Sequence, residues 1–359
     1  MTADEPIIWC LLGKKAGDNT QVRALAKALG FSVQEKQIVA RPWELVTHLV
    51  LRATLAGIDR NASSELHAPW PDLVITAGRR NEPVARWIKE QSGGATKLVH
   101  IGRPWSPLDT FDLIITTPQY FLPEQDNILH NTLPLHQLSQ AVLEHAARSL
   151  LPQIEHLPPP WIVVLVGGDS GRFVFTAEKA RRLAQYSGQL AASCGGSVLL
   201  TDSPRTPQRS GDALQAALPQ PHYCHRWGAG GDNPYLGLLA VADAFVVTGE
   251  SMSMLGEAAS CGKPVYIFDM GDGESAWWKH RHNYRYKPLS HRLAMRFGPQ
   301  RMRRDIGNIQ SVMVDSGQAR WLDGGSKFSS GSAAGAGAEP DNSELERAAT
   351  AVRRLVIPS

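Results

Sequence analysis

The chain has 359 residues, more than one hydrophobic core usually organises, so we expect two domains. Its 43% hydrophobic and 20% charged residues suffice for ordinary cores, which argues against disorder and against a coiled coil. The 37 Lys and Arg against 34 Asp and Glu leave a formal charge of +3, which gives no support to nucleic-acid binding.

The N-terminal half alternates two kinds of segment. Apolar runs of four to six residues, bounded by Gly, Pro or Asp, predict buried strands over Ile7–Leu12, Leu73–Thr76, Leu98–Ile101 and Leu113–Thr116. Between them, helices are predicted over Gln21–Leu29, Pro42–Leu55 and Asn81–Gln91. Strands that alternate with helices indicate a parallel α/β sheet. A further helix is predicted over Leu138–Leu151.

A proline-rich stretch divides the chain. Leu157–Pro160 holds three consecutive prolines and cannot continue a helix, so we place a domain boundary there. We therefore predict a Rossmann-like domain over 1–156 and a second over 161–324, followed by a flexible Gly/Ala/Ser loop over 325–342 and a helix within 343–359. The second domain has strands predicted over Trp161–Val166, Ser197–Thr201, Ala244–Thr248 and Pro264–Asp269, and helices over Thr176–Ser193, Pro207–Ala217, Tyr235–Val241 and Ser251–Cys261.

The four cysteines lie in or beside apolar stretches without C-x-x-C spacing, so we expect reduced, buried thiols. No basic segment precedes the first apolar run, and no apolar run reaches the about 18 residues of a membrane-spanning helix. We predict a cytoplasmic protein, at most attached to a membrane surface.

Several catalytic motifs are incomplete. Gly249–Ser253 resembles a nucleophile elbow but ends in Ser where the motif needs Gly, so a hydrolase is the weaker interpretation. His280 and His282 lack a third metal ligand at suitable spacing and are expected to be solvated. Asp269–Asp272 has the wrong spacing for an Asp-x-Asp metal motif. We expect no metal and no cofactor.

The strongest signal is the passage from the strand Ala244–Thr248 into the next helix. Gly249 permits the turn, and Ser251 or Ser253 can cap the helix, whose first amides then favour a diphosphate. Glu257 lies four residues after Ser253, about one turn further on the same face, where its carboxylate can accept from two ribose hydroxyls. Alternatively, Ser251 is an ordinary N-cap and Glu257 a solvated residue.

Five motifs, specific in their order rather than singly, carry a resemblance: Gly17–Gln21, Thr76–Arg80, His100–Pro104, Gly167–Gly168 and Thr248–Ala258. The last is similar to the donor-binding helix of GT-B glycosyltransferases, and residues 7–357 resemble the mitochondrial-fission (elongated mitochondria) family. The resemblance implies an α/β GT-B fold, with two Rossmann-like domains whose parallel sheets face an interdomain cleft. It places the acceptor in the N-terminal half and the donor in the C-terminal half, with the last helix returning to the first domain.

Donor-side roles follow from the resemblance. Near the helix start it implies that the amides of Ser251, Ser253 and Met254 bind the diphosphate and that Glu257 binds the ribose. Glu250 is also expected among the donor-binding residues. Further donor-binding candidates follow the first two strands of the second domain: Gly167, Gly168, Arg172, Ser203 and Arg205. The two glycines form either a phosphate-approaching loop or a plain turn. Trp227 borders either the base or the core.

Acceptor-side roles are less determined. Asp18 is the candidate general base for the acceptor hydroxyl, or else forms a capping box with Gln21. Lys14 is a candidate for stabilising the leaving phosphate. Arginines at strand ends favour an anionic or lipid-linked acceptor, or are simply solvated: Arg79, Arg80 and Arg103.

Lys279–Arg304 contains nine Lys and Arg and no Asp or Glu, which suits an anionic membrane surface or a solvated face. We therefore predict a metal-independent glycosyltransferase, cytoplasmic and peripheral on the inner membrane. It would move a sugar from a nucleoside diphosphate to a hydroxyl of an envelope glycolipid or lipopolysaccharide precursor. The alternative is a nucleotide-binding or non-catalytic scaffold of the fission-family type.

Overall fold

The computed structural model describes residues 5–43, 52–171, 173–271, 293, 296–298, 304–329 and 339–357. Most of the helix predicted over Pro42–Leu55, the donor-site candidate Arg172 and most of the basic segment Lys279–Arg304 lie outside these residues. The chain forms two compact units, which we describe separately. The first contains β1 to β6, residues 304–305 and α11; the second contains α4 to β12 apart from those two residues.

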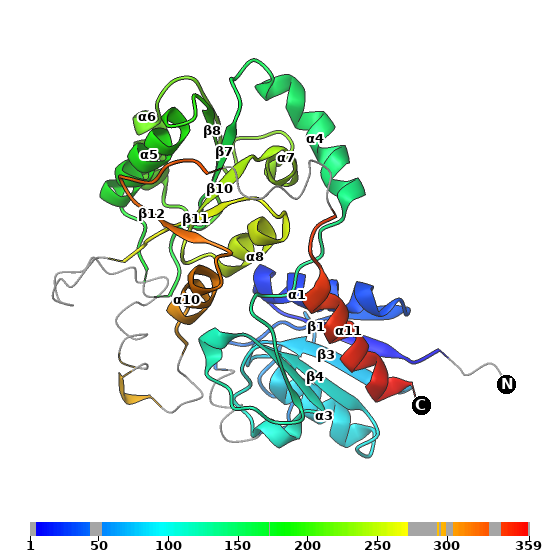
Figure 1. Ribbon diagram of the computed structural model, residues 1–359. Coiled ribbons are helices and arrows are strands. Elements are labelled where there is room, and N and C mark those ends of the chain that lie inside the picture. Colours follow the sequence, from blue (N-terminus) through cyan, green and yellow to red (C-terminus); the bar gives the residue numbers. More distant parts are fainter. Residues whose placement is uncertain are drawn as a thin grey trace. The chain divides into compact units, whose positions relative to one another are not determined.

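The first unit is built on a parallel sheet, of which Figure 1 labels β1, β3 and β4. The sheet has six strands in the order β2-β1-β3-β4-β5-β6. Its strands are β1 (Ile8–Leu12), β2 (Val33–Gln37), β3 (Leu73–Ala77), β4 (Lys97–Ile101), β5 (Leu113–Thr116) and β6 (Ile128–His130). Each is parallel to its neighbours, with Cys10 opposite both Glu35 and Ile75.

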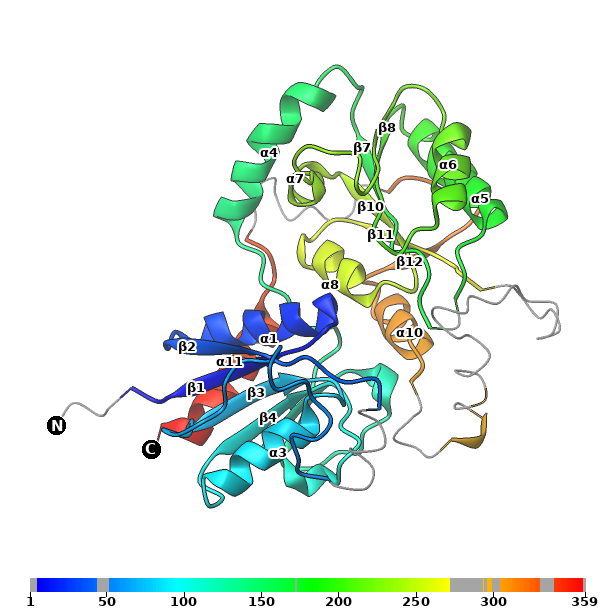
Figure 2. The ribbon, with the colours of Figure 1, turned by 180° about the vertical axis from the view of Figure 1, so that it is seen from behind.

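Helices cover both faces of this sheet because its side chains alternate between two cores. On one face, Ile8, Cys10 and Leu12 pack with α1 (Ala16–Leu29) and α11 (Ser343–Val356). On the other, Trp9 and Leu11 pack with α3 (Glu82–Gln91). Figure 2 shows α1 and α11 side by side. The last helix of the chain therefore completes the first unit.

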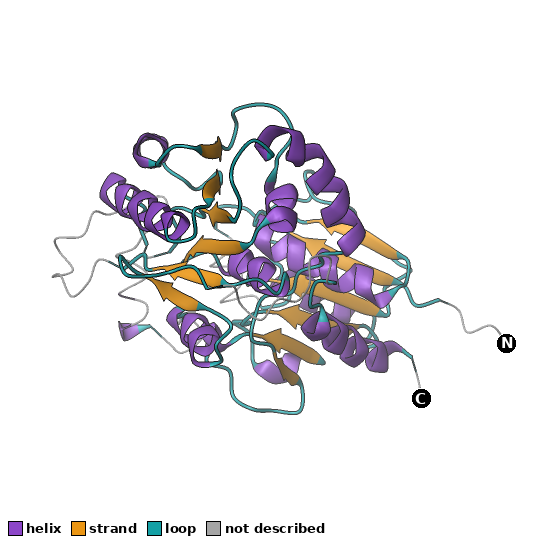
Figure 3. Cartoon of the chain, turned by 45° about the horizontal axis from the view of Figure 1, so that its top comes forward, coloured by secondary structure: helices purple, strands orange, loops and turns teal. Residues whose placement is uncertain are grey.

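The second unit has a parallel sheet in the order β12-β11-β10-β7-β8-β9. Its strands are β7 (Trp161–Leu165), β8 (Ser197–Thr201), β9 (His222–His225), β10 (Ala244–Thr248), β11 (Val265–Phe268) and β12 (Arg320–Leu322). Its helices are α4 (Gln140–Ile154), α5 (Ala177–Ala192), α6 (Gln208–Ala217), α7 (Tyr235–Val241), α8 (Met252–Ser260) and α10 (Gly307–Asp315). Helices flank the strands in Figure 3.

The predicted α/β fold class, with two Rossmann-like parallel sheets, is confirmed. The interdomain cleft stays a prediction. One difference concerns α4, which we predicted within domain 1–156. The structure groups it with the second unit, because it packs against α7 and Leu150 approaches Gly237. Within the described parts of the chain, none of the helices combines the length and apolar character needed to cross a membrane.

The packing of α11 yields a stability prediction. Val352 is fully buried against the first unit's core, so Val352→Ala should lower the free energy of unfolding by about 2 kcal/mol in urea denaturation. Val142 on α4 is 46% exposed, so Val142→Ala should change it by less than about 0.5 kcal/mol. Equal effects would contradict the docking of α11.

Candidate functional site

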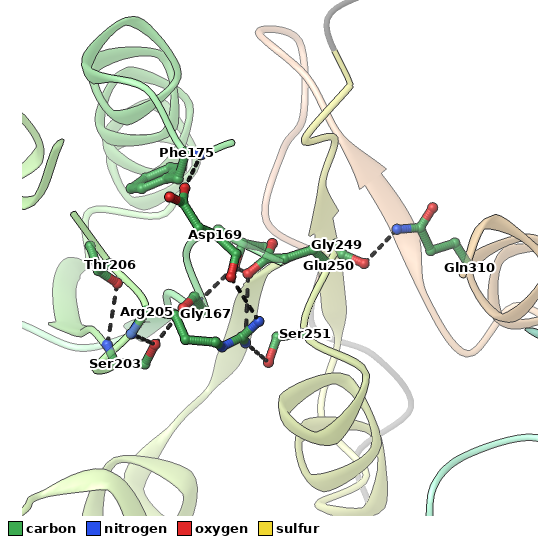
Figure 4. Close-up of polar contacts among 11 residues, drawn as sticks. Gly167, Asp169, Phe175, Ser203, Arg205, Thr206, Gly249, Glu250, Ser251 and Gln310 are labelled. Carbon is green, nitrogen blue, oxygen red and sulfur yellow. Dashed lines mark hydrogen bonds and ion pairs between the residues drawn. The ribbon is translucent and has the colours of Figure 1, made fainter. Parts of the chain in front are cut away.

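Three connections meet at the carboxyl edge of the second sheet. They follow β7, β8 and β10, which are neighbours in the strand order, so their ends lie together. Figure 4 shows the turns after β7 and β10 and the loop after β8 joined by a network of polar contacts. Ligands of open α/β sheets bind at this edge.

Gly167 lies where the three connections are closest. A Cβ at this position would lie 2.2 Å from Glu250 Oε1, 2.7 Å from Arg205 Nη2 and 2.7 Å from Ser251 Cβ. The neighbouring Gly168 has φ +97°, and a Cβ there would approach the Arg205 carbonyl to 2.5 Å. The glycines therefore allow contact between protein segments. Whether they also approach a phosphate stays a prediction.

Glu250 is completely buried within this network. Its Oε1 accepts a hydrogen bond of 3.1 Å from the Thr248 hydroxyl and lies 4.0 Å from Arg205 Nη2. Burial raises the pKa of Glu250 to about 7, opposed by the charge of Arg205 and by hydrogen bonds from the Glu250 amide, the Thr248 hydroxyl and the Gly168 amide. A carboxylate with no exposed surface cannot touch a donor in this conformation, and a donor-binding role for Glu250 stays a prediction.

Arg205 is the partly exposed cation of the network, with 30% of its side chain accessible. Its Nη2 donates to Ser251 Oγ at 3.3 Å and its Nη1 to the Asp169 carbonyl at 3.4 Å. Its backbone amide donates to Ser203 Oγ, and the Ser203 hydroxyl donates in turn to the Gly167 carbonyl. The structure thus holds Arg205 beside Ser251, the residue that precedes α8, while leaving part of the arginine side chain exposed.

The start of α8 differs from the prediction in one respect. Ser251 is the N-cap residue, but its side chain makes no capping hydrogen bond; its hydroxyl accepts from Arg205. Ser253 is exposed and Met254 is half-buried in the first turn. Amides of a first helical turn lack intrahelical partners and suit an anion.

Glu257 lies further along α8 and is half-buried. Its Oε2 accepts a short hydrogen bond from the Tyr235 hydroxyl of α7. Burial raises the pKa of Glu257, and this hydrogen bond opposes the rise. The idea that Glu257 is an ordinary solvated residue is wrong. Sequence reasoning missed Tyr235, which was assigned only to a helix.

Trp227 is 55% exposed, so the alternative of a core tryptophan is wrong. Its amide donates to Asp202 Oδ1 at 2.5 Å, and the neighbouring Arg226 pairs with Asp202 Oδ2 at 2.6 Å. Because Asp202 directly precedes Ser203, these bonds tie the loop of Trp227 to the loop that carries Arg205. A base contact for Trp227 stays a prediction.

The first unit places Asp18 at the carboxyl edge of its own sheet. Helix α1 begins at Ala16 with Lys15 as N-cap residue, so Asp18 is the third helical residue and the capping-box alternative is wrong. The Asp18 side chain is 31% exposed, and its Oδ2 lies 3.7 Å from Lys15 Nζ. A Cβ on Gly78 would come within 2.7 Å of that oxygen, so Asp18 lies against the turn after β3.

Two of the three acceptor-side arginines, Arg79 and Arg103, contact residues of the first unit. The Arg79 guanidinium lies 4.7 Å from the Trp105 ring centroid, and Arg80 directly follows it. Arg103 Nη1 donates to the carbonyls of Tyr120 and Phe121, and burial lowers the Arg103 pKa. Arg103 therefore fixes a turn, and its acceptor role stays a prediction. Lys14 is exposed.

Two residues without a predicted role fix loops at the carboxyl edge of the first sheet by hydrogen bonds. Asn19 closes the turn after β1, because its Oδ1 accepts from the Gly13 amide and its Nδ2 donates to the Gly13 carbonyl. Glu82 is fully buried and accepts from the amides of Trp105 and Ser106, and burial raises its pKa to about 7. The described residues contain no group of three or more His, Cys, Asp and Glu side chains arranged to hold a metal ion.

Fold and site thus define an α/β protein with two Rossmann-like units and, in the second, an arginine held at a helix start. The family model "Mitochondrial fission ELM1" matches residues 16–302, and the chain belongs to this family, as the sequence predicted. Mitochondrial fission protein ELM1 of Arabidopsis thaliana is 31% identical over 240 residues, which are 61% of this chain and 56% of the plant protein. Uncharacterized protein RP120 of Rickettsia prowazekii (strain Madrid E) is 28% identical over 300 residues, 73% of this chain and 82% of that protein.

Solved structures with a similar fold include glycosyltransferases and an epimerase. Acinetobacter baumannii MurG is 13% identical with a TM-score of 0.47, over 98% of this chain and 92% of its own. E. coli ADP-heptose LPS heptosyltransferase II is 13% identical with a TM-score of 0.41, and the match covers 87% of this chain and 99% of the heptosyltransferase. UDP-GlcNAc 2-epimerase from Neisseria meningitidis, bound to UDP-GlcNAc, is 14% identical with a TM-score of 0.41. The match covers 86% of this chain and 98% of the epimerase. At these identities the likeness concerns the fold alone.

The crowding around Gly167 yields a prediction. Gly167→Ala should lower the free energy of unfolding by about 2 kcal/mol, because its Cβ would push Glu250 and Arg205 out of their positions. Gly325 in the same unit meets nothing closer than 3.6 Å, so Gly325→Ala should cost less than about 0.5 kcal/mol. Urea denaturation compares the two, and a silent Gly167→Ala would contradict this packing.

Proposed function

We propose that the chain is a glycosyltransferase that moves a sugar from a nucleoside diphosphate to a hydroxyl acceptor. The observation that carries the proposal is Arg205, partly exposed and held beside the uncapped start of α8 by Ser251 and Asp169. A guanidinium and free helix amides together favour a diphosphate. Membership of the fission family does not itself establish catalysis.

The chemistry follows from charge. When the bond between sugar and diphosphate breaks, negative charge develops on the leaving phosphate oxygen. Arg205 and the amides of Ser253 and Met254 would stabilise that charge in the transition state. Glu257, beyond the first turn of α8, would accept from ribose hydroxyls in exchange for its bond with Tyr235.

The acceptor loses a proton as its oxygen attacks the sugar. Asp18 is the proposed base, since its carboxylate is partly exposed at the carboxyl edge of the first sheet. The nearby Arg79 and Arg80 favour an anionic acceptor. An envelope glycolipid or lipopolysaccharide precursor at the inner membrane is the acceptor that we propose. The basic segment proposed to meet that membrane lies mostly outside the described residues.

The second candidate is a scaffold that binds nucleotide or partner proteins without catalysis. It is favoured by the likeness to the plant protein named for mitochondrial fission. Both candidates have the same fold. A ligand test on the whole chain therefore asks first whether a nucleotide binds, and release of nucleoside diphosphate then separates the transferase from the scaffold.

Thermal unfolding with UDP-N-acetylglucosamine, GDP-mannose and ADP-glucose provides this test. One of them, at 100 times its dissociation constant, should stabilise the chain by about 2.7 kcal/mol. The bound donor should then release free nucleoside diphosphate only when an acceptor extract is added. Stabilisation without release would favour a nucleotide-binding scaffold, and no stabilisation by any donor would contradict the transferase.

The role of Glu257 is tested by substitution. Glu257→Ala should weaken donor binding about tenfold or more, because charge-assisted hydrogen bonds to the ribose are lost. Glu144, exposed on α4 of the same unit, is a matched control whose change to alanine should leave affinity unaltered. Calorimetric titration measures both, and unchanged affinity in Glu257→Ala would reject the ribose contact.

A further inference from the structure

The Glu250 carboxylate is enclosed but incompletely bonded. Its Oε1 accepts from Thr248 at 3.1 Å, and the amides of Glu250 and Gly168 also favour the charged carboxylate. Oε2 is buried without a hydrogen-bond partner among the described residues. Gly167 leaves room beside Oε1, because a Cβ at that position would lie 2.2 Å from this oxygen. Figure 4 shows Glu250 among the residues that follow β7, β8 and β10. Burial raises the pKa of such a carboxylic acid, because it penalises the charged form.

Arg205 provides the opposing charge, at the long distance of 4.0 Å. The other acids near the network have partners of their own: Asp169 Oδ1 accepts from the Phe175 amide at 2.7 Å, and Asp202 pairs with Arg226. From α10, the uncharged Gln310 donates to the Gly249 carbonyl at 2.6 Å. Burial has the largest effect on the Glu250 pKa, and among the charged groups Arg205 is the one that opposes it. Consistent with this balance, the pKa of Glu250 is raised to about 7.

Arg205 cannot pair fully with both the Glu250 carboxylate and a bound diphosphate. The proposed diphosphate would lie at the start of α8, beside Ser251, which already accepts from Arg205 Nη2. A bound diphosphate would draw the guanidinium away from Glu250 and add negative charge close to the carboxylate. Two like charges in a buried site favour neutralisation of the acid.

We propose that Glu250 takes up one proton from solvent, on its unpartnered oxygen, when the donor diphosphate binds, so that Arg205 pairs with phosphate instead of carboxylate. This inference rests on the proposed function. No covalent bond other than the new O–H forms, and none within the donor breaks. Glu250 thereby controls, without touching the donor, how much positive charge the site offers to it.

The direction of the pH dependence follows from this linkage. The protonated protein binds the diphosphate more tightly, so affinity rises as the pH falls. With a pKa of about 7 in the free protein that is raised further in the complex, binding should be tighter at pH 6 than at pH 8, by up to about tenfold. At pH 7, about half a proton should be taken up per bound donor.

Isothermal titration calorimetry tests the inference with the intact protein and whichever of UDP-N-acetylglucosamine, GDP-mannose and ADP-glucose binds. These diphosphate diesters lack the phosphate monoester group that titrates near pH 6, so uptake measured in two buffers of different ionisation enthalpy reports the protein. The wild-type chain alone can overturn the inference, since no uptake at pH 7 would contradict it. If none of the three donors binds, the proposed function fails and this inference fails with it.

Glu250→Gln identifies the group that takes up the proton. The variant should bind with no uptake near pH 7 and with a flat affinity between pH 6 and pH 8. Glu82→Gln is the matched control, because Glu82 is equally buried in the first unit and its pKa is also raised to about 7. Its uptake should equal that of the wild type. Uptake retained in Glu250→Gln would show that Glu250 is not the group.

Discussion

The structure of the site depends on one steric constraint, the close approach of three connections at Gly167. With Glu250 Oε1, Arg205 Nη2 and Ser251 Cβ all within 2.7 Å of where a Cβ would stand, only glycine fits. This approach encloses the Glu250 carboxylate while leaving Arg205 30% exposed at the start of α8. Burial thus separates two charges that are close in space, one held inside and one available to an anion. The proposed donor chemistry uses that available charge.

The central strands were predictable because they are uniformly apolar. Runs such as Ala244–Thr248 are buried on both faces, and their sequences show it. The four strands that the sequence did not reveal are the edges of the two sheets: β2, β6, β9 and β12. Edge strands are only partly covered, so they keep polar residues, as in the sequence Val-Gln-Glu-Lys-Gln of β2. Such segments look like loops without their neighbours.

Within the site, the positions of the turn and the helix start could be predicted from the sequence, but the hydrogen-bond partners of the side chains could not. The turn at Gly249 and the helix start after Ser251 were predicted from glycine and serine preferences, and both lie where they were predicted. The Ser251 hydroxyl, however, accepts from an arginine 46 positions earlier in the chain, and Glu257 accepts from Tyr235 of α7. Likewise, Glu250 looks like an exposed turn residue until the β7 and β8 connections cover it. These pairings depend on strand order, which local patterns do not encode.

The central claim is that the start of α8, with Arg205, binds the diphosphate of a nucleotide. A crystal structure of the chain with a bound nucleoside diphosphate tests it most directly. Our account predicts electron density for both phosphates beside Ser251, within hydrogen-bond distance of the Arg205 guanidinium and of the Ser253 and Met254 amides. Density for the nucleotide at another surface, with Arg205 still turned to Glu250, would contradict it.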